Sequence, residues 1–230
     1  MAIAVVLAAW WARPAGSVRG LPRTFVWAWE RAEDVRFLDP KDTGVAFLAR
    51  TVFLRNGQVT VQPRRNPLRY TPGSVLMAVV RVDADHGPMP QTADAARAVA
   101  EAGELPGVRA VQVDFDATKS QRDFYRQVLS GVRSRLRRDQ QLSVTALASW
   151  CEADHWIDGL PVDEAVPMLF RMGAGERVPE RFRPSLCRAS AGISLDEPVP
   201  VPRGVERVYV FSPRPWTRAD YLTVMREVGR

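Results

Sequence analysis

The sequence predicts an α/β fold, a compact barrel of parallel strands, and three observations carry that prediction. Eight apolar segments have the length and the β-branched, aromatic character of buried strands. Segments with helical spacing lie between several of them, and strand–helix alternation produces parallel sheets with right-handed crossovers. Polar or aromatic residues recur just after the apolar runs, at the end of each strand where barrels carry their reactive groups.

The expected strands cover residues 24–29, 45–54, 75–82, 110–113, 142–150, 165–172, 189–195 and 205–211. Arg55-Asn56-Gly57 is a hairpin signal, followed by a returning strand at 58–62. Helices are expected over 93–102, from Ser120 to about Leu136, and after Thr217. Eight strands favour a closed, TIM-like (β/α)8 barrel over an open sheet. Because 230 residues is near the lower limit for that fold, several helices must be short or missing.

The composition fits one globular domain, residues 21–230, and it excludes several functions. The net charge of +6 comes from dispersed arginines, which outnumber lysines 30 to 2. The densest cluster, Arg133, Arg135, Arg137 and Arg138, is expected on the solvated face of a helix, so no nucleic-acid partner is predicted.

The sequence has no zinc spacing, phosphate loop or dinucleotide turn, so we predict no cofactor and no metal. His86 and His155 lack partners at useful spacing and are expected on the surface or in loops.

The N-terminus carries an apolar run, residues 2–11, that is too short to span a bilayer. It has the length of the apolar part of a signal peptide, and small residues follow it. We therefore expect residues 1–20 to be a leader, with export to the periplasm or the exterior and envelope association through this segment. The alternative is a misassigned start.

Cys151 and Cys187 are compatible with a disulfide or with two small buried side chains.

Asp114 and Asp116 are the central candidate residues. They lie two positions apart at the end of the fourth strand, so both side chains are expected to point into the barrel. Two close inward carboxylates cannot both ionise freely, so the pKa of one should be raised. That arrangement suits acid–base chemistry on glycosidic bonds. The alternative is a structural pair that binds Arg81 or Arg171.

Further strand-end residues are expected around this pair. Indole rings stack on sugars, and Trp29, Trp150 and Trp216 each follow an apolar run, whereas Trp27 and Trp156 are expected in the core. Arg81, Asp83 and Arg171 are the other expected substrate contacts. Glu152 and Glu197 are candidate acids, although Asp196-Glu197-Pro198 also has the composition of a turn.

Five segments in order, LPRTFVWAWER, AVQVDFDAT, LSVTALASWC, LPVDEAVPMLFRMG and SAGISLDEP, resemble a bacterial family catalogued as domain of unknown function 3142. The resemblance covers the chain from about Leu21 onward and brings no established activity with it. Since that family is mostly exported, the resemblance favours a disulfide between Cys151 and Cys187.

A more distant similarity is to family 18 glycoside hydrolases, the chitinase-like barrels, which carry Asp-x-Asp-x-Glu after the fourth strand. Asp114, Asp116, the sixth-strand Met168 and Trp216 match that pattern, but Thr118 stands where the proton-donating Glu is expected. The resemblance implies an exported, polysaccharide-directed barrel, a glycoside hydrolase if Asp116 pairs with Glu152, Glu197 or Glu30. The alternative is a barrel that binds carbohydrate without cleaving it, or one that is associated with the envelope.

Overall fold

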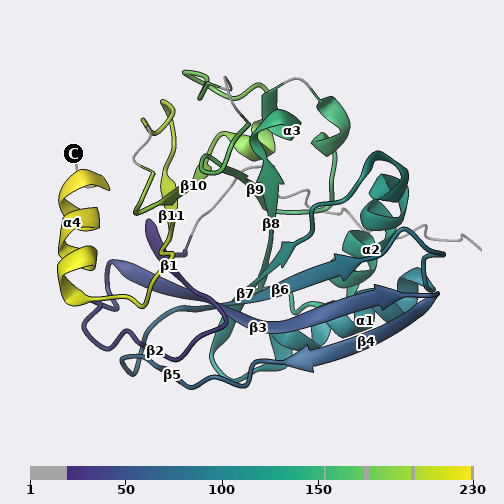
Figure 1. Cartoon of the computed structure of the whole chain (residues 1–230), viewed down its shortest axis with the longest axis horizontal. Coiled ribbons are helices and arrows are strands. Elements are labelled where there is room, and N and C mark those ends of the chain that lie inside the picture. Colours follow the sequence, from purple (N-terminus) through teal and green to yellow (C-terminus); the bar gives the residue numbers. More distant parts are fainter. Residues whose placement is uncertain (1–19, 153, 174–176, 198–199, 229–230) are drawn as a thin grey trace, which may run out of the picture.

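The computed structural model describes residues 20–152, 154–173, 177–197 and 200–228, and they form the predicted closed barrel of parallel strands (Figure 1). The strands follow one another around the barrel in chain order, and β1 pairs with both β3 and β11 to close it. They are β1 Thr24–Ala28, β3 Thr43–Arg55, β6 Leu76–Ala84, β7 Val108–Asp114, β8 Gln141–Leu147, β9 Glu164–Met168, β10 Ser190–Ser194 and β11 Arg207–Phe211. The predicted leader, residues 1–20, lies outside the described residues except for its last position.

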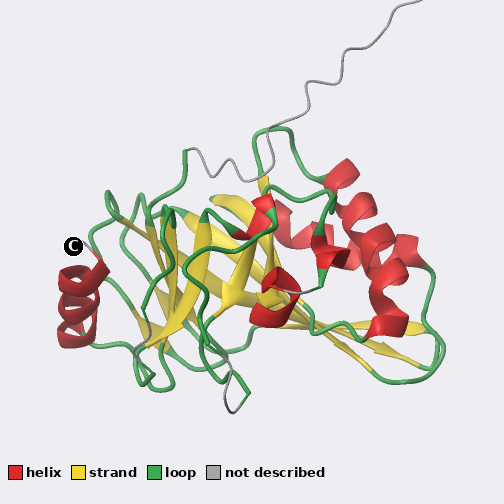
Figure 2. Ribbon diagram, turned by 90° about the horizontal axis from the view of Figure 1, so that it is seen from above, coloured by secondary structure: helices red, strands yellow, loops and turns green. Residues whose placement is uncertain are grey.

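Three short strands complete the sheets. β4 Gln58–Pro63 returns antiparallel along β3 after the turn at Asn56 and Gly57, which both have positive φ, as the sequence predicts. β2 Glu33–Asp34 pairs with β5 Leu68–Arg69 in a separate two-stranded sheet. With 13 residues, β3 is long enough to project with β4 beyond the barrel, as Figures 1 and 2 show.

The helices cover the barrel unevenly (Figure 2). α1 Thr92–Ala100, which continues into η1 Glu101–Glu104, and α2 Arg122–Arg135 lie on one flank, while α4 Arg218–Val228 lies on the opposite one. Short helical segments, α3 Ala148–Glu152 and η3 His155–Ile157, follow β8, and η4 Ser185–Cys187 precedes β10. None of the helices in the described residues is long and apolar enough to cross a bilayer.

The helix expected to open at Ser120 begins slightly earlier, with η2 Lys119–Gln121. Thr118 caps it through a capping box, in which the Gln121 side chain accepts a 2.9 Å hydrogen bond from the Thr118 backbone N–H. Thr118 therefore has a local structural role at the position where the chitinase-like pattern has its acid.

The outer core lies between the strands and the helices. Outward-facing side chains such as Val52 and Val82 pack with Val99 of α1 and Val128 of α2 in one large apolar cluster. The two helices pack closely because residue 131 is glycine: a Cβ there would lie 2.7 Å from the Cβ of Ala96. The outer core thus packs α1 and α2 against the outer face of β6 and β7, the strands that carry Arg81 and Asp114.

The inner core is a stack of aromatic rings inside the barrel. The ring centroid of Tyr209 lies 5.2 Å from that of Phe25 and 5.5 Å from that of Trp27. Two glycines on the surrounding strands make room for the stack, because a Cβ at Gly44 would meet the Phe25 ring at 2.3 Å and one at Gly192 would meet Trp27 at 2.9 Å. The Trp27 Nε1–H is satisfied by Gln112 Oε1 at 2.8 Å.

A buried ion pair closes the amino end of the barrel. Glu164 and Arg207 are the first residues of β9 and β11, and the two side chains meet at 3.0 Å, each 1% exposed. The hydroxyls of Ser190 and Tyr209 also donate to Glu164, and Arg207 Nε donates to the carbonyl of Pro22 at 2.8 Å. The carboxylate is thus compensated on several sides, as a buried charge must be.

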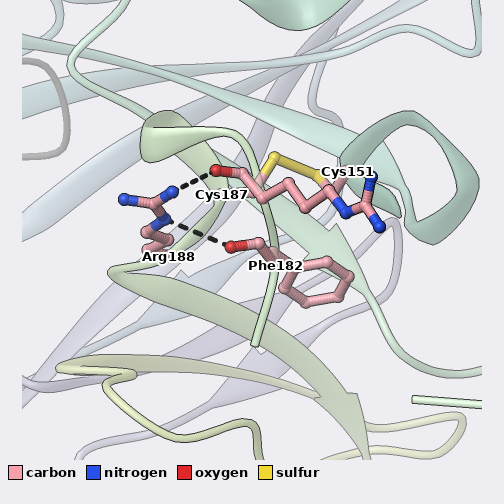
Figure 3. Close-up of a disulfide and its surroundings, with 5 residues drawn as sticks. Cys151, Phe182, Cys187 and Arg188 are labelled. Atoms are coloured by element: carbon pink, nitrogen blue, oxygen red, sulfur yellow. Dashed lines mark hydrogen bonds between the residues drawn. A yellow bond between two sulfur atoms is a disulfide. The ribbon is translucent and has the colours of Figure 1, made fainter. Parts of the chain in front are cut away.

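Cys151 and Cys187 form a disulfide with 5.9 Å between the Cα atoms (Figure 3). The bond joins α3 to η4, and both cysteines are fully buried. The neighbouring Arg188 side chain donates to the carbonyls of Phe182 and Arg183, which fixes the segment that enters β10.

The arginine cluster at the end of α2 and just beyond it is mostly exposed, as the sequence predicts: Arg135, Arg137 and Arg138 are exposed, and Arg133 is partly buried. Arg133 Nη1 lies 3.1 Å from Asp163 Oδ2, and Arg137 donates to the carbonyls of Gly103 and Val108, both at 3.2 Å. These arginines tie the end of α2 to the amino-terminal side of the barrel.

Candidate functional site at the carboxyl mouth of the barrel

Asp114 ends β7 on the inner wall of the barrel mouth. Val113 of β7 pairs with Val144 of β8, so the next residues along these parallel strands, Asp114 and Thr145, lie beside each other. The Thr145 hydroxyl donates a 2.8 Å hydrogen bond to Asp114 Oδ1. On the other side, Arg81 of β6 is the partner of Asp114 in register. In the described part of the chain, the hydrogen-bond donor to Asp114 is a threonine, while Arg81, an arginine of the structural alternative, lies beside Asp114 and acts on it through its charge.

The surroundings of Asp114 raise its pKa above the usual value. Burial is the largest cause, and the nearby Asp116 charge adds to it; the Thr145 hydrogen bond and the Arg81 charge act in the opposite direction. One raised pKa is what the sequence predicts for the pair. A carboxyl group that keeps its proton to a higher pH is suited to donate that proton.

Asp116 differs from the expected arrangement, because β7 ends at Asp114 and Asp116 lies beyond it, exposed. Between them, the Phe115 ring is buried in the outer core, 5.0 Å from the ring of Tyr125. A tight turn follows, in which the Ala117 N–H donates to the Phe115 carbonyl at 2.8 Å. Asp116 is therefore exposed at the rim, beyond the end of the strand, and its charge still acts on Asp114; that its side chain points into the barrel stays a prediction.

Across the mouth, partly buried aromatic side chains pack against one another and against the inner core. Phe211 stacks on Phe170 at 5.5 Å between ring centroids, and Trp29 meets Phe211 edge-on at 6.4 Å. The guanidinium of Arg171 lies 5.6 Å from the Phe211 ring centroid, and the Arg171 backbone N–H donates to Glu197 Oε2 at 2.7 Å. This side of the mouth combines apolar ring faces with an exposed cation, and it contains three of the predicted residues, Trp29, Arg171 and Glu197.

Leu147 adds an apolar patch between these two sides. It is the last residue of β8, pairs with Met168 of β9, and is 42% exposed. Thr145, Leu147, Phe170 and Phe211 were not singled out from the sequence. The alternation of inward and outward positions along each strand was the signal that could have identified them.

Trp150 and Trp216 do not line the mouth, contrary to the prediction. Trp150 is buried in α3 and packs edge-on against Trp156, 4.9 Å between ring centroids. Trp216 is buried in the outer core, where its Nε1–H donates to the Trp27 carbonyl at 2.9 Å and its backbone N–H donates to Glu33. Trp27 and Trp156 pack in the core as expected, the former almost completely buried and the latter half-buried.

The remaining candidates are dispersed around the rim. Glu152 is exposed at the end of α3, and Glu30 is exposed beyond β1. Asp83 forms a 2.8 Å ion pair with Arg55, both partly exposed. His86 is exposed in the loop after β6, whereas nothing is described of the His155 side chain. Within the described residues, no group of three or more His, Cys, Asp or Glu side chains is placed to hold a metal ion.

The comparisons with known proteins are sparse. No family model and no curated protein matches this chain. Among solved structures, the spore cortex-lytic enzyme SleL of Bacillus cereus aligns with a TM-score of 0.46 and 19% identity over 76% of this chain. The aligned part is 51% of that enzyme, so this chain spans about half its length. The resemblance to domain of unknown function 3142 stays a prediction.

Proposed function

We propose that this protein binds a polysaccharide or oligosaccharide at the carboxyl mouth of the barrel. The observation that carries the proposal is the half-buried Asp114 on the inner wall, facing a mouth whose other side is built from Trp29, Phe170 and Phe211. Sugar rings present apolar faces that stack on aromatic side chains and hydroxyls that donate to carboxylates. A site with aromatic walls and a few fixed polar groups suits such a ligand.

The proposal extends to hydrolysis of the bound glycan, with Asp114 as the proton donor. Burial raises the pKa of Asp114, which favours the protonated form needed at the leaving oxygen. A second, ionised carboxylate is required across the bond, about 5–5.5 Å away in a retaining enzyme and about 6.5–9.5 Å in an inverting one. The exposed Asp116 at the rim is the first candidate for it, followed by Glu197.

The second candidate function is carbohydrate binding without cleavage. Two observations favour it: Thr118 is a helix-capping residue where the chitinase-like pattern has its acid, and the Glu197 carboxylate already accepts a hydrogen bond from the Arg171 backbone. Under this reading the mouth retains a sugar site but lacks a competent pair of acids.

We also propose that the protein is exported, to the periplasm or the exterior, where a polysaccharide partner is accessible. The buried disulfide supports this proposal, because such bonds persist in oxidising compartments and are rare in the cytosol. Fractionation of the producing cells, with a cytosolic marker as control, tests it. Recovery of the chain in the cytosol with both thiols reduced would contradict it.

Binding to a glycan array tests the first step, with Trp29→Ala as the site variant and Leu222→Ala as the control. Trp29 lies at the mouth, whereas Leu222 is 50% exposed on α4. Loss of a stacking ring is expected to weaken binding by about 10-fold or more, and the control should bind as wild type does. Failure of the wild type to bind any glycan, or equal binding by Trp29→Ala, would count against the mouth as a sugar site.

A further inference from the structure

The β3–β4 hairpin extends the inner wall of the barrel into a sheet that projects past the mouth (Figures 1 and 2). We call its mouth-facing surface the shelf, and it consists of Thr51, Phe53, Thr60, Gln62, Arg81 and Asp83. These residues come from three adjacent strands, β6, β3 and β4.

The strand register connects the shelf to Asp114. Asp114 pairs with Arg81, Arg81 with Thr51, and Thr51 with Gln62, so one row crosses β7, β6, β3 and β4. Residues paired in register point to the same face of a sheet. At about 4.8 Å between strands, the row from Asp114 to Gln62 is about 14 Å long, the length of a short oligosaccharide.

The opposite face of the same strands is occupied by the core. Val52, Leu54 and Val82 alternate with the shelf residues and pack against α1 and α2. The shelf side chains therefore face away from the helices. Most are polar, and several are exposed, including Arg81 and Gln62.

One aromatic ring interrupts this polar surface. Phe53 is half-buried, pairs with Asp83 and Thr60, and belongs to neither apolar cluster. The Arg55 guanidinium lies 5.7 Å from its ring centroid and is held by Asp83 at 2.8 Å. A fixed ring bordered by polar groups is a surface on which a sugar can stack.

A hollow lies at the root of the hairpin, where β1 and β3 diverge. Its polar lining includes Glu30, Thr51, Gln62, Arg65 and Asn66. Arg64 fixes this hollow, since its guanidinium donates to the carbonyls of Ala28 at 3.0 Å, Trp29, and Arg31 at 2.5 Å. The hollow therefore adjoins both the shelf and the segment that carries Trp29.

We infer that the shelf carries additional sugar-binding subsites, so that a glycan held at Asp114 continues across β6 and β3 toward Gln62 and the hollow. This inference rests on the proposed function, because it concerns the same glycan and specifies its path across the sheet and its length. Gln62 and Arg65 contact sugars distant from the reacting bond, and they select for chain length.

Calorimetry with two soluble probe series tests the inference: linear β-1,4-linked oligomers of N-acetylglucosamine and of glucose, from disaccharide to hexasaccharide. The variants are Gln62→Ala, Arg65→Ala and their double variant, with Gln127→Ala, an exposed glutamine on α2, as the matched control. Gln62 and Arg65 are exposed, so these substitutions spare the core.

Wild type is expected to bind one series more tightly as the chain lengthens. Each single variant should weaken binding of the hexasaccharide by about 3- to 10-fold, which is the effect of losing one hydrogen bond. The affinity for the disaccharide should not change. If the double variant and wild type bind every length equally, the shelf inference is overturned while the mouth site stands. If wild type binds neither series at any length, the inference and the proposed function both fail for these glycans.

Discussion

Thr145 and Asp114 lie side by side on β8 and β7, and the threonine hydroxyl donates a 2.8 Å hydrogen bond to the aspartate carboxylate. The bond holds a half-buried carboxyl group in place on the inner wall of the barrel. Two effects oppose each other there: burial raises the pKa of Asp114, and the hydrogen bond lowers it.

The pKa of Asp114 has a consequence for stability. Since the native value is raised above 3.8, the native state binds more protons than the unfolded state between the two pKa values. The contribution of Asp114 to the free energy of unfolding therefore falls as the pH rises through that interval. Asp114→Asn removes this dependence, so its melting temperature minus that of wild type should increase with pH from about pH 3.8 upward. A difference that stays constant, or decreases, would contradict the assignment.

Removal of the Thr145 hydroxyl should raise the pKa of Asp114 further. Thr145→Val keeps the shape of the side chain but loses the hydrogen bond to the carboxylate, whereas Thr145→Ser retains it. Carboxyl-carbon NMR titration of Asp114 should show a higher pKa in the valine variant and a nearly wild-type pKa in the serine variant. A lowered or unchanged pKa in Thr145→Val would show that the bond does not stabilise the ionised form.

The disulfide should contribute substantially to stability. Cys151 and Cys187 are 36 positions apart, and on the loop-entropy estimate that closure is worth about 4 kcal/mol. Replacement of both cysteines by serine should lower the melting temperature by about 8–16 °C for a chain of this size. Differential scanning calorimetry measures this, with a surface substitution, Ser130→Ala on the exposed side of α2, as control. A change of less than about 2 °C would mean that the surrounding packing alone holds α3 to η4.

Because the Glu164–Arg207 ion pair is buried, loss of Arg207 should destabilise the protein far more than loss of an exposed arginine. Arg207→Met leaves Glu164 buried without its cation, which should cost about 3–5 kcal/mol of unfolding free energy. Arg203→Met, at an exposed position, should change it by no more than about 0.5 kcal/mol. Urea unfolding at neutral pH compares the two. Equal stability of both variants would show that Ser190 and Tyr209 suffice to compensate Glu164.

The barrel was predictable from the sequence because buried parallel strands have a clear signature. Each expected apolar segment overlaps one barrel strand, and Asn56-Gly57 marks the hairpin. The ends were less certain: β8 stops at Leu147 rather than Trp150, since Ala148 already begins α3. Apolar residues continue across that boundary, so composition does not show where the backbone changes from extended to helical.

The same limitation explains the errors at the mouth. Trp150 was assigned to a strand end, but it lies in a helical turn that directs it into the outer core. Trp216 follows β11 at the expected place, but its backbone and indole N–H groups bind Glu33 and Trp27, residues distant in the sequence. Only tertiary contacts determine whether a residue beyond a strand turns inward or outward.

Release of reducing ends from a bound glycan tests the central claim most directly. The glycan that gives the strongest array signal is incubated with wild type, Asp114→Asn, Asp116→Asn and a control, Glu104→Gln. Glu104 is an exposed residue of η1. We expect turnover by wild type and the control, a loss of about 100-fold or more in Asp114→Asn, and a clear loss in Asp116→Asn. Binding without release of reducing ends by wild type, or full turnover by Asp114→Asn, would contradict this claim.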